Sequence, residues 1–277
     1  MKKIFLIATL AIISVLAFAA CADNSPTAAE TGTAIAALDP AAAAPSNDVL
    51  IMGTSADFPP FEFIAEGGAG RHGHYDGIDV AIALRIAERA GRELVIQDLP
   101  FDGLLMALNA GSIDFIASGM TITAERQQQV NFSVPYFEAM QYIVVQAGNT
   151  DITSAADLNS AIVGVQLATT GDMFATENLD NEPIRYNRIN EAIMALRAGQ
   201  LDAIIIDSAT ALMFAGAAGD LAIVRDDVAF AGEHYGIATR HDDPELGAII
   251  DEVITEMTAA GEIEALFAEF AELFAEE

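Results

Sequence analysis

The sequence predicts an α/β fold with largely parallel sheets, and three observations support this prediction. From residue 49 onward, short apolar segments of strand length alternate with longer segments whose apolar residues have helical spacing. Two of these helical segments are followed directly by glycine, a residue that commonly ends helices. The chain has 277 residues, of which 53% are hydrophobic, so it is long enough to bury a large core.

The first half of the pattern contains three strands, each followed by a helix. Residues 49–54 are an apolar strand, and residues 78–90 are a helix because Ile78, Ile82 and Ile86 share one face before Gly91. A strand at 94–97 precedes a helix at 104–110, which Gly111 ends. A strand at 115–117 precedes a short helix from residue 124, whose first turn Thr123 can cap.

The second half continues the alternation. Strands are expected at 142–146, 162–165, 203–206 and 236–239, and helices at 172–179, at 191–198, after Asp207 and in a long tail from residue 244. In sheets of this kind, ligands bind at the carboxyl ends of the strands, where loops and helix N-termini converge. The loops that follow the strands are therefore the place to look for functional residues.

The charge of the chain excludes two classes of partner. Twelve basic residues against 41 acidic ones give a formal net charge of −29. Such a negative field repels nucleic acid and anionic membrane surfaces, so neither is expected as a partner.

The N-terminus is typical of an exported protein. Lys2 and Lys3 precede an apolar run, and residues 1–20 are predicted to be a signal peptide. The segment from Phe18 to Cys21 resembles a bacterial lipobox, so Cys21, the only cysteine, is expected to be lipidated; an ordinary signal peptide with an incidental cysteine is the alternative. Residues 21–47 are rich in Ala, Thr, Ser and Pro and are predicted to be a flexible, lipid-anchored tether.

The loops after the strands contain the groups that a zwitterion requires. Residues 55–63 present aromatic side chains beside two prolines, residues 118–126 end in an arginine, residues 166–172 offer hydroxyl groups, and Asp207 follows its strand directly. An arginine makes a planar two-point contact with a carboxylate, and helix N-termini add favourable partial positive charge. A carboxylate pairs with an ammonium group, so these loops predict a receptor for a free amino acid.

Several of these segments resemble the signature blocks of family 3 solute-binding proteins, the polar amino-acid receptors of ABC importers. The blocks are Phe58-Pro-Pro-Phe-Glu-Phe, Pro100-Phe-Asp-Gly-Leu-Leu, Ala117-Ser-Gly-Met-Thr-Ile-Thr-Ala-Glu-Arg126, Val163-Gly-Val-Gln with Thr169-Thr-Gly171, and Tyr235-Gly-Ile. They occur in the family's order between about residues 50 and 270. The resemblance implies a periplasmic-binding-protein type II fold, in which two α/β lobes are joined by a two-segment hinge. It places lobe 1 at 48–141 plus 238–277 and lobe 2 at 142–237.

The resemblance also implies roles for the polar site residues. Arg126 matches the arginine that grips the ligand α-carboxylate, helped by Thr121 and Thr170. Ser118 and Gly119 match the positions that receive the α-ammonium, and Asp207 matches the acid that binds it from the other lobe.

Other positions are expected to contact the ligand side chain. Phe58 and Phe101 match the flanking aromatics, and Gln166 matches a position that reads the end of the side chain in some members. One departure concerns Ser55, where many members have an acid; here the acid is Asp57, which favours a cationic side chain slightly. Thr169, beside Thr170 in its block, is also expected at the site.

Each candidate has a simpler structural interpretation. Arg126 could be a surface arginine, Asp207 and the threonines at 169 and 170 could only cap helices, and the aromatics could be ordinary core residues. His72 and His74 form a His-x-His, but no third ligand with suitable spacing lies nearby, so no metal site is expected.

The sequence therefore predicts a non-catalytic receptor of an ABC importer, without cofactor, that closes around one polar amino acid, with glutamine, arginine, lysine and histidine all open. Its expected partners are the ligand and the importer's permease, and it is expected to be a monomer outside the cytoplasm that meets the membrane only through its lipid anchor. One alternative is a cyclohexadienyl dehydratase-like enzyme, although no histidine or lysine accompanies a carboxylate at a strand end. Another alternative is an amino-acid sensor that works with a separate signalling chain.

Overall fold

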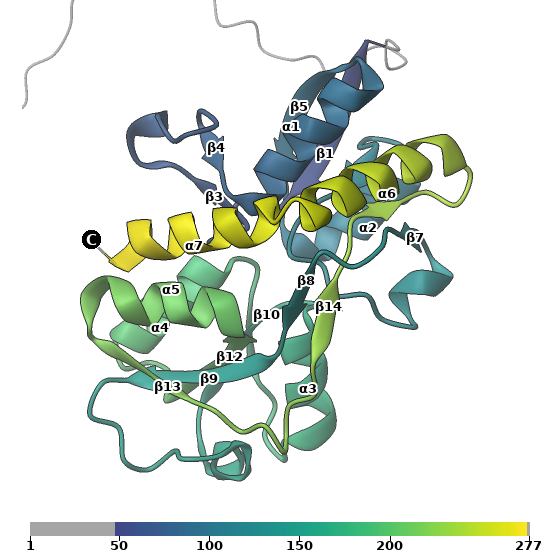
Figure 1. The fold of residues 1–277 in the computed structure, drawn as a ribbon. Coiled ribbons are helices and arrows are strands. Elements are labelled where there is room, and N and C mark those ends of the chain that lie inside the picture. The colour runs from purple at the N-terminus through teal and green to yellow at the C-terminus, as the bar shows by residue number, and fades with distance from the viewer. Residues whose placement is uncertain (1–47, 276–277) are drawn as a thin grey trace, which may run out of the picture. The chain divides into compact units, whose positions relative to one another are not determined.

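Two five-stranded sheets organise residues 48–275, the part of the chain that the computed structural model describes (Figure 1). Each sheet is the centre of one α/β lobe, so the predicted fold class with two lobes is confirmed. The predicted signal peptide, Cys21 and the tether lie outside the described residues. Within those residues, no helix combines the length and the apolar character that crossing a membrane requires.

The first lobe is built on a sheet with the strand order β5-β1-β6-β15-β7. Its strands are β1 (Val49–Thr54), β5 (Glu93–Asp98), β6 (Phe115–Ile116), β7 (Asn131–Phe132) and β15 (Ala238–Thr239). Strands β5 and β6 pair with β1 in parallel, whereas β15 pairs antiparallel with both β6 and β7. The helices of this lobe are α1 (Ile78–Ala90), α2 (Leu104–Asn109), α6 (Pro244–Ala259) and α7 (Glu262–Ala275).

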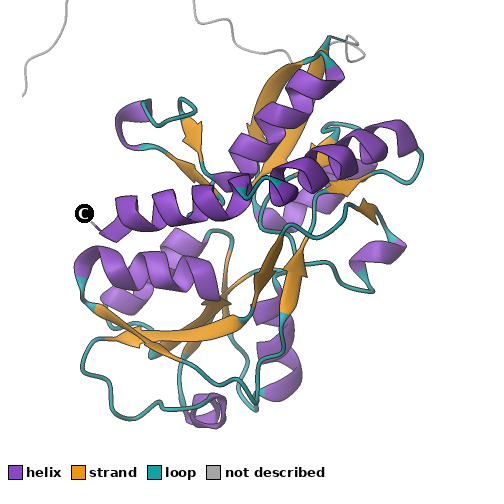
Figure 2. Ribbon diagram, viewed as in Figure 1, coloured by secondary structure: helices purple, strands orange, loops and turns teal. Residues whose placement is uncertain are grey.

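The second lobe is built on a sheet with the strand order β11-β10-β12-β9-β13. Its strands are β9 (Gln141–Gln146), β10 (Val163–Gln166), β11 (Ile184–Tyr186), β12 (Ala203–Asp207) and β13 (Leu221–Val224). Its helices are α3 (Thr170–Asn178), α4 (Ile189–Arg197) and α5 (Ser208–Ala218), which pack on the strands (Figure 2). Four short 3₁₀ turns complete the described elements: η1 (Glu66–Gly68), η2 (Phe101–Gly103), η3 (Arg126–Gln128) and η4 (Ala155–Ser160).

Two antiparallel strands, β8 (Phe137–Ala139) and β14 (Glu233–Tyr235), run side by side between the sheets (Figure 1). After β8 the chain enters the second sheet through β9, and after β14 it re-enters the first sheet through β15. These strands are the two hinge segments. The lobe boundaries predicted at 141/142 and 237/238 stay a prediction, and β9 and β15 begin at Gln141 and Ala238.

The expectation of largely parallel sheets is wrong for half of each sheet. Strands β9 and β13 pair antiparallel in the second sheet, as β15 and β7 do in the first. Parallel pairing needs a crossover connection, usually a helix, between the paired strands. Strands β9 and β15 instead follow the hinge strands without a crossover helix, and they can therefore pair antiparallel with their neighbours.

A small three-stranded antiparallel sheet that the sequence did not predict, β2-β3-β4, extends from the first lobe and is called the hairpin below. Its strands are β2 (Asp57–Phe58), β3 (Glu62–Ile64) and β4 (Tyr75–Asp76). Phe61 within it is fully buried and packs edge-on against Phe137 and Tyr235 of the hinge strands, with ring centroids 4.9 and 5.0 Å apart. The hairpin thus attaches the loop after β1 firmly to the hinge.

Candidate functional site

One cavity lies where the strand-end loops of the two lobes meet. Its lining is contributed by both lobes and consists of Ser55, Phe58, Glu62, Phe101, Ser118, Gly119, Thr121, Arg126, Gln166, Thr169, Thr170 and Asp207. Every side chain that the sequence predicted for the site is therefore at this cavity except Asp57. The reason is topological, because β1, β6, β10 and β12 all end at this edge of their sheets.

Arg126 provides the fixed positive charge of the cavity. It is the first residue of η3, and its backbone N–H donates to the hydroxyl of Thr123, the predicted cap. Its side chain is buried, donates to the carbonyls of Thr121 (2.7 Å) and Ala168 (3.0 Å), and stacks over Phe101 at 5.3 Å. Burial lowers the pKa of Arg126, but nearby carboxylates oppose that effect and an arginine stays protonated. It can therefore pair with a ligand anion.

Glu233, on hinge strand β14, lies behind the threonines that flank Arg126. Its Oε2 accepts hydrogen bonds from the hydroxyls of Thr121 and Thr170, both at 2.8 Å, which belong to different lobes. The side-chain amide of Gln141 approaches the same oxygen at 3.4 Å. Glu233 is not among the site residues predicted from the sequence, although it stands two residues before the Tyr235-Gly-Ile block.

Asp207 places an acid across the cavity from the first lobe. It occupies the N-cap position of α5, yet its side chain makes no capping hydrogen bond. Burial, followed by the charge of Glu233, raises the pKa of Asp207 to about 7. Its Oδ1 is buried without a hydrogen-bond partner among the described residues, a costly state that an ammonium group would relieve.

Ser118 and Gly119 hold the backbone of the first lobe against the cavity. The N–H of Gly119 donates to Asp79 at 2.8 Å, and the hydroxyl of Ser118 donates to Glu62 at 2.8 Å. Gly119 has a φ of +48°, and a Cβ there would lie 2.9 Å from the ring of Phe58. These hydrogen bonds fix the position of the turn at the edge of the cavity.

Glu62 is a second acid of the cavity that the sequence analysis did not single out. Its side chain is 1% exposed, and its Oε2 has no hydrogen-bond partner among the described residues. Burial, and then the adjacent Asp79, raise the pKa of Glu62 well above its ordinary value. Burial likewise raises the pKa of Asp79 to about 6, although Tyr136 donates to it at 2.8 Å. The cavity therefore borders a buried acidic pair.

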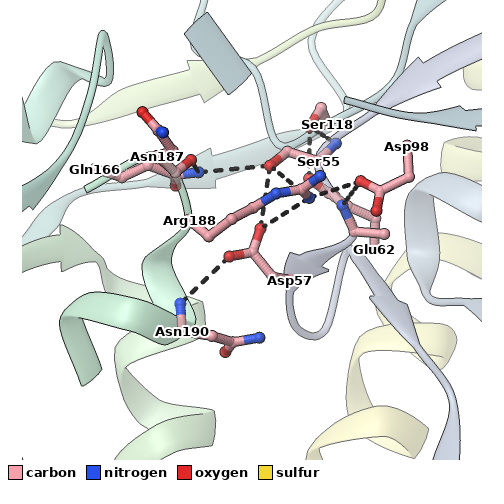
Figure 3. A network of polar contacts seen from close by, with 10 residues as sticks. Ser55, Asp57, Glu62, Asp98, Ser118, Gln166, Asn187, Arg188 and Asn190 are labelled. Atoms are coloured by element: carbon pink, nitrogen blue, oxygen red, sulfur yellow. Dashed lines mark hydrogen bonds and ion pairs between the residues drawn. The ribbon is translucent and has the colours of Figure 1, made fainter. Parts of the chain in front are cut away.

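A second polar part of the cavity lining, here called the Ser55 end, is formed by Ser55 and Gln166, one from each lobe, which lie close together (Figure 3). The amide of Gln166 donates to the Ser55 hydroxyl at 3.5 Å. Asp57 lies beside them but does not line the cavity. Its carboxylate accepts from the Ser55 hydroxyl (3.1 Å) and from the backbone N–H of Asn190 (3.3 Å).

The threonines at 169 and 170 have different neighbours. Thr169 is the N-cap of α3, and its hydroxyl accepts from the backbone N–H of Asp172. Thr170 begins the helix and contacts Glu233. The capping interpretation therefore holds for Thr169, although its side chain also lines the cavity.

The His-x-His segment lies away from the cavity. His72 pairs with Asp76 at 2.6 Å, and among the described residues no group of three metal-ligating side chains occurs. The histidine thus has a structural partner on its own hairpin.

The family model of the bacterial extracellular solute-binding proteins, family 3, matches residues 50–272. The arginine-binding extracellular protein ArtP of Bacillus subtilis is 34% identical over 221 residues, covering 78% of this chain and 84% of that protein. A probable histidine-binding protein of Neisseria gonorrhoeae is 31% identical over 264 residues, covering 93% of this chain and 91% of its own.

A solved structure is also similar in sequence and fold. The arginine-bound form of truncated ArgBP from T. maritima has a TM-score of 0.71 at 41% identity, covering 76% of this chain and 97% of its own. Its two-lobed architecture agrees with the periplasmic-binding-protein fold expected from the sequence.

Proposed function

The chain belongs to family 3 of the bacterial extracellular solute-binding proteins, and on that premise we propose that it is the receptor of an ABC importer for an amino acid with a cationic side chain. One observation carries the zwitterion half of this proposal. Arg126 and Asp207 come from different lobes and line one cavity, and the buried Oδ1 of Asp207 has no hydrogen-bond partner among the described residues. A free amino acid offers a carboxylate to the first and an ammonium to the second, so it satisfies both charges at once.

The acids around the cavity support a cationic side chain. Besides Asp207, the cavity has Glu62 in its lining, with Asp79 directly behind it. A guanidinium or ammonium near Glu62 favours its ionised form and supplies the missing partner of Oε2. The relatives named for arginine and histidine binding agree with this choice, and arginine is the first candidate.

The polar site residues of the two lobes bind different parts of the ligand. Arg126 and Thr121 hold the carboxylate from the first lobe, while Thr170 and Asp207 meet the ligand from the second. Ser118 and Gly119 offer their carbonyls to the ammonium. Closure about β8 and β14 then buries each ligand charge only when its partner is in place.

The remaining cavity residues surround the ligand side chain. Phe58 and Phe101 flank it, and Ser55, Gln166 and Thr169 complete the polar lining. No lysine or histidine lines the cavity, so the residues that do line it supply no combination of base and carboxylate for a dehydratase. The relatives named above are binding proteins.

The placement outside the cytoplasm follows from the family, and the anchoring is part of the proposal. Residues 1–20 direct export, Cys21 receives the lipid, and residues 21–47 tether the two lobes to the membrane. The receptor acts as a monomer, and its closed form presents the ligand to the importer's permease.

Calorimetric titration of the purified protein with arginine, lysine, histidine, glutamine and cystine tests the function. Arginine or lysine is expected to bind most tightly and to stabilise the protein by about 2.7 kcal/mol at 100 times the dissociation constant. Arg126→Ala is expected to abolish the signal, and Arg197→Ala, which removes a surface arginine paired with Asp220, is expected to preserve it. No binding of any amino acid by the unaltered protein would contradict the receptor function. Preference for glutamine would contradict only the cationic ligand.

A further inference from the structure

A cluster of charged residues joins the two lobes beside the Ser55 end of the cavity (Figure 3). From the first lobe come Ser55 and Asp57, which follow β1, and Asp98, which ends β5. From the second lobe comes Arg188, the residue before α4, together with the first N–H groups of that helix. Across the lobes, Arg188 is 90 residues from Asp98 and Asn190 is 133 residues from Asp57 in the sequence, so closure of the lobes is needed to bring them together.

Arg188 is the central residue of this cluster. Its Nη1 donates to Asp98 Oδ1 at 2.6 Å, approaches the Ser55 hydroxyl at 3.4 Å and lies 3.8 Å from Asp57 Oδ1. The Arg188 side chain is 25% exposed and that of Asp98 21%, so water screens the pair less than it would at an open surface.

Asp57 adds a second connection between the lobes. Its Oδ2 accepts from the backbone N–H of Asn190 at 3.3 Å, at the N-terminus of α4, where the helix dipole favours a negative charge. The Asp57 side chain is 6% exposed, so it is buried against the opposite lobe. Separation of the lobes would remove the contacts of this carboxylate with Asn190 and Arg188, and would leave only its bond from the Ser55 hydroxyl of the same lobe.

None of the three charged residues lines the ligand cavity. Their contacts are made between protein groups alone, and they can therefore form whether or not a ligand is bound. They also include the acid that the sequence pattern assigned to the ligand side chain.

We propose that Arg188, Asp98 and Asp57 form a clasp that holds the lobes closed without ligand and slows ligand release. The effect on ligand release rests on the proposed receptor function, whereas the effect on closure of the empty protein does not. The clasp favours the closed state of the empty protein. When an amino acid is inside, the same contacts must break before it leaves, so the clasp slows dissociation, and by holding the empty protein closed it also slows association. These are positioning residues, because they act on the ligand only through the lobes.

The first test measures the empty protein. Spin labels at Met106→Cys and Val228→Cys, in a Cys21→Ser background, report the distance between the lobes, and both parent side chains are well exposed. Arg188→Gln and Asp98→Asn are each expected to shift the distance distribution toward open forms, and the double variant is expected to add little. Arg188→Lys keeps the positive charge but loses the planar guanidinium group, so an intermediate shift of the distance distribution is expected.

The matched control is Arg197→Gln at the other end of α4. Arg197 pairs with Asp220 of its own lobe, so this variant removes one charge from the same helix without touching the clasp. Its distances are expected to equal those of the unaltered protein. Unchanged distances in Arg188→Gln, or an equal shift in Arg197→Gln, would overturn the clasp.

The second test measures release of bound arginine by stopped-flow displacement. Arg188→Gln is expected to raise the dissociation rate about fivefold to tenfold, and to raise the association rate as well because more of the empty protein is open. Equal dissociation rates would overturn the effect on release. If the distances respond but no amino acid binds, the clasp stands and the receptor function fails, so the two failures are distinguishable.

Discussion

The two ends of the cavity contain different kinds of polar group. At the Arg126 end, the groups come from short motifs that follow strands, and the hinge acid Glu233 contacts a threonine from each lobe. At the Ser55 end, Asp57, Asp98 and Arg188 pair with one another across the lobes and leave the cavity lining to Ser55 and Gln166. Under the two proposals above, the first end recognises what all amino acids share, whereas the second end combines recognition with closure.

This comparison shows that an acid near a ligand site need not face the ligand. Asp57 and Glu62 belong to the same hairpin, and both are buried. Asp57 has partners from the other lobe, but Glu62 lines the cavity and its Oε2 has no hydrogen-bond partner in the part of the chain that the structure describes. The predictions that follow test whether the ends act as differently as their contacts indicate.

The largest effect is expected from Arg126→Ala. This change leaves the ligand carboxylate without its buried counter-charge, which costs about 3–5 kcal/mol. The affinity is therefore expected to fall roughly 150- to 5,000-fold for every amino acid tested by calorimetry. Arg126→Lys is expected to retain part of the affinity, and a loss of less than about tenfold in the alanine variant would contradict the assigned role.

The next largest effect is expected from Asp207→Asn, which should weaken ligand binding and stabilise the ligand-free protein. The pKa of Asp207 is about 7 and that of Asp79 about 6, against an ordinary value of 3.8, because both are buried. The native state thus holds more protons than the unfolded chain between about pH 4 and pH 7. The stability that these two groups contribute to the ligand-free protein is therefore lost as the pH rises through that window.

Melting curves of the ligand-free protein check the sign. At pH 8, Asp207→Asn is expected to raise Tm by about 2–4 °C, because it removes a buried charge, and at pH 5 the gain is expected to be smaller. The same variant is expected to weaken ligand binding about 10²-fold at pH 8, since it no longer pairs with the ammonium. A variant that melts below the unaltered protein at pH 8 would show that the charge of Asp207 has a partner that stabilises it.

Glu62→Gln is expected to change selectivity more than overall affinity. It removes the charge offered to a cationic side chain, so the ratio of arginine to glutamine affinity is expected to fall about tenfold, or ~1.4 kcal/mol. Asp57→Asn is the matched comparison on the same hairpin, and it is expected to alter the two ligands equally because Asp57 does not line the cavity. An equal loss of both ligands in Glu62→Gln would assign Glu62 to positioning Ser118.

The smallest effect is expected from Glu233→Gln. Its carboxylate accepts hydrogen bonds from the hydroxyls of Thr121 and Thr170. Its negative charge repels the carboxylate of a bound amino acid. Removal of that charge is expected to tighten arginine binding about threefold and to leave the amide of arginine, which has no carboxylate, almost unchanged. Weaker binding of arginine alone would show that Glu233 supports the carboxylate through the threonines.

Much of the fold was predictable because its signals are local. Helix α1 has the predicted bounds and ends at Gly91, whose φ of +65° explains the glycine. Strand β1 also begins and ends as predicted. The antiparallel hinge strands and the hairpin β2-β3-β4 were not predicted, since they are two or three residues long and their partners lie elsewhere in the chain.

The sequence by itself determined the strand–helix alternation, the family and the loops that carry Arg126, Ser118, Thr170 and Asp207. These follow from periodicity and from motifs in which each residue stands beside the strand end that positions it. The tertiary structure alone decided that Asp57 pairs with the other lobe, that Glu62 lines the cavity and that Glu233 holds two threonines. The sequence separations explain the difference: 133 residues divide Ser55 from Arg188, and 112 divide Thr121 from Glu233. Contacts over such separations exist only in the folded chain, because nothing in the local sequence states which acid will meet which distant partner.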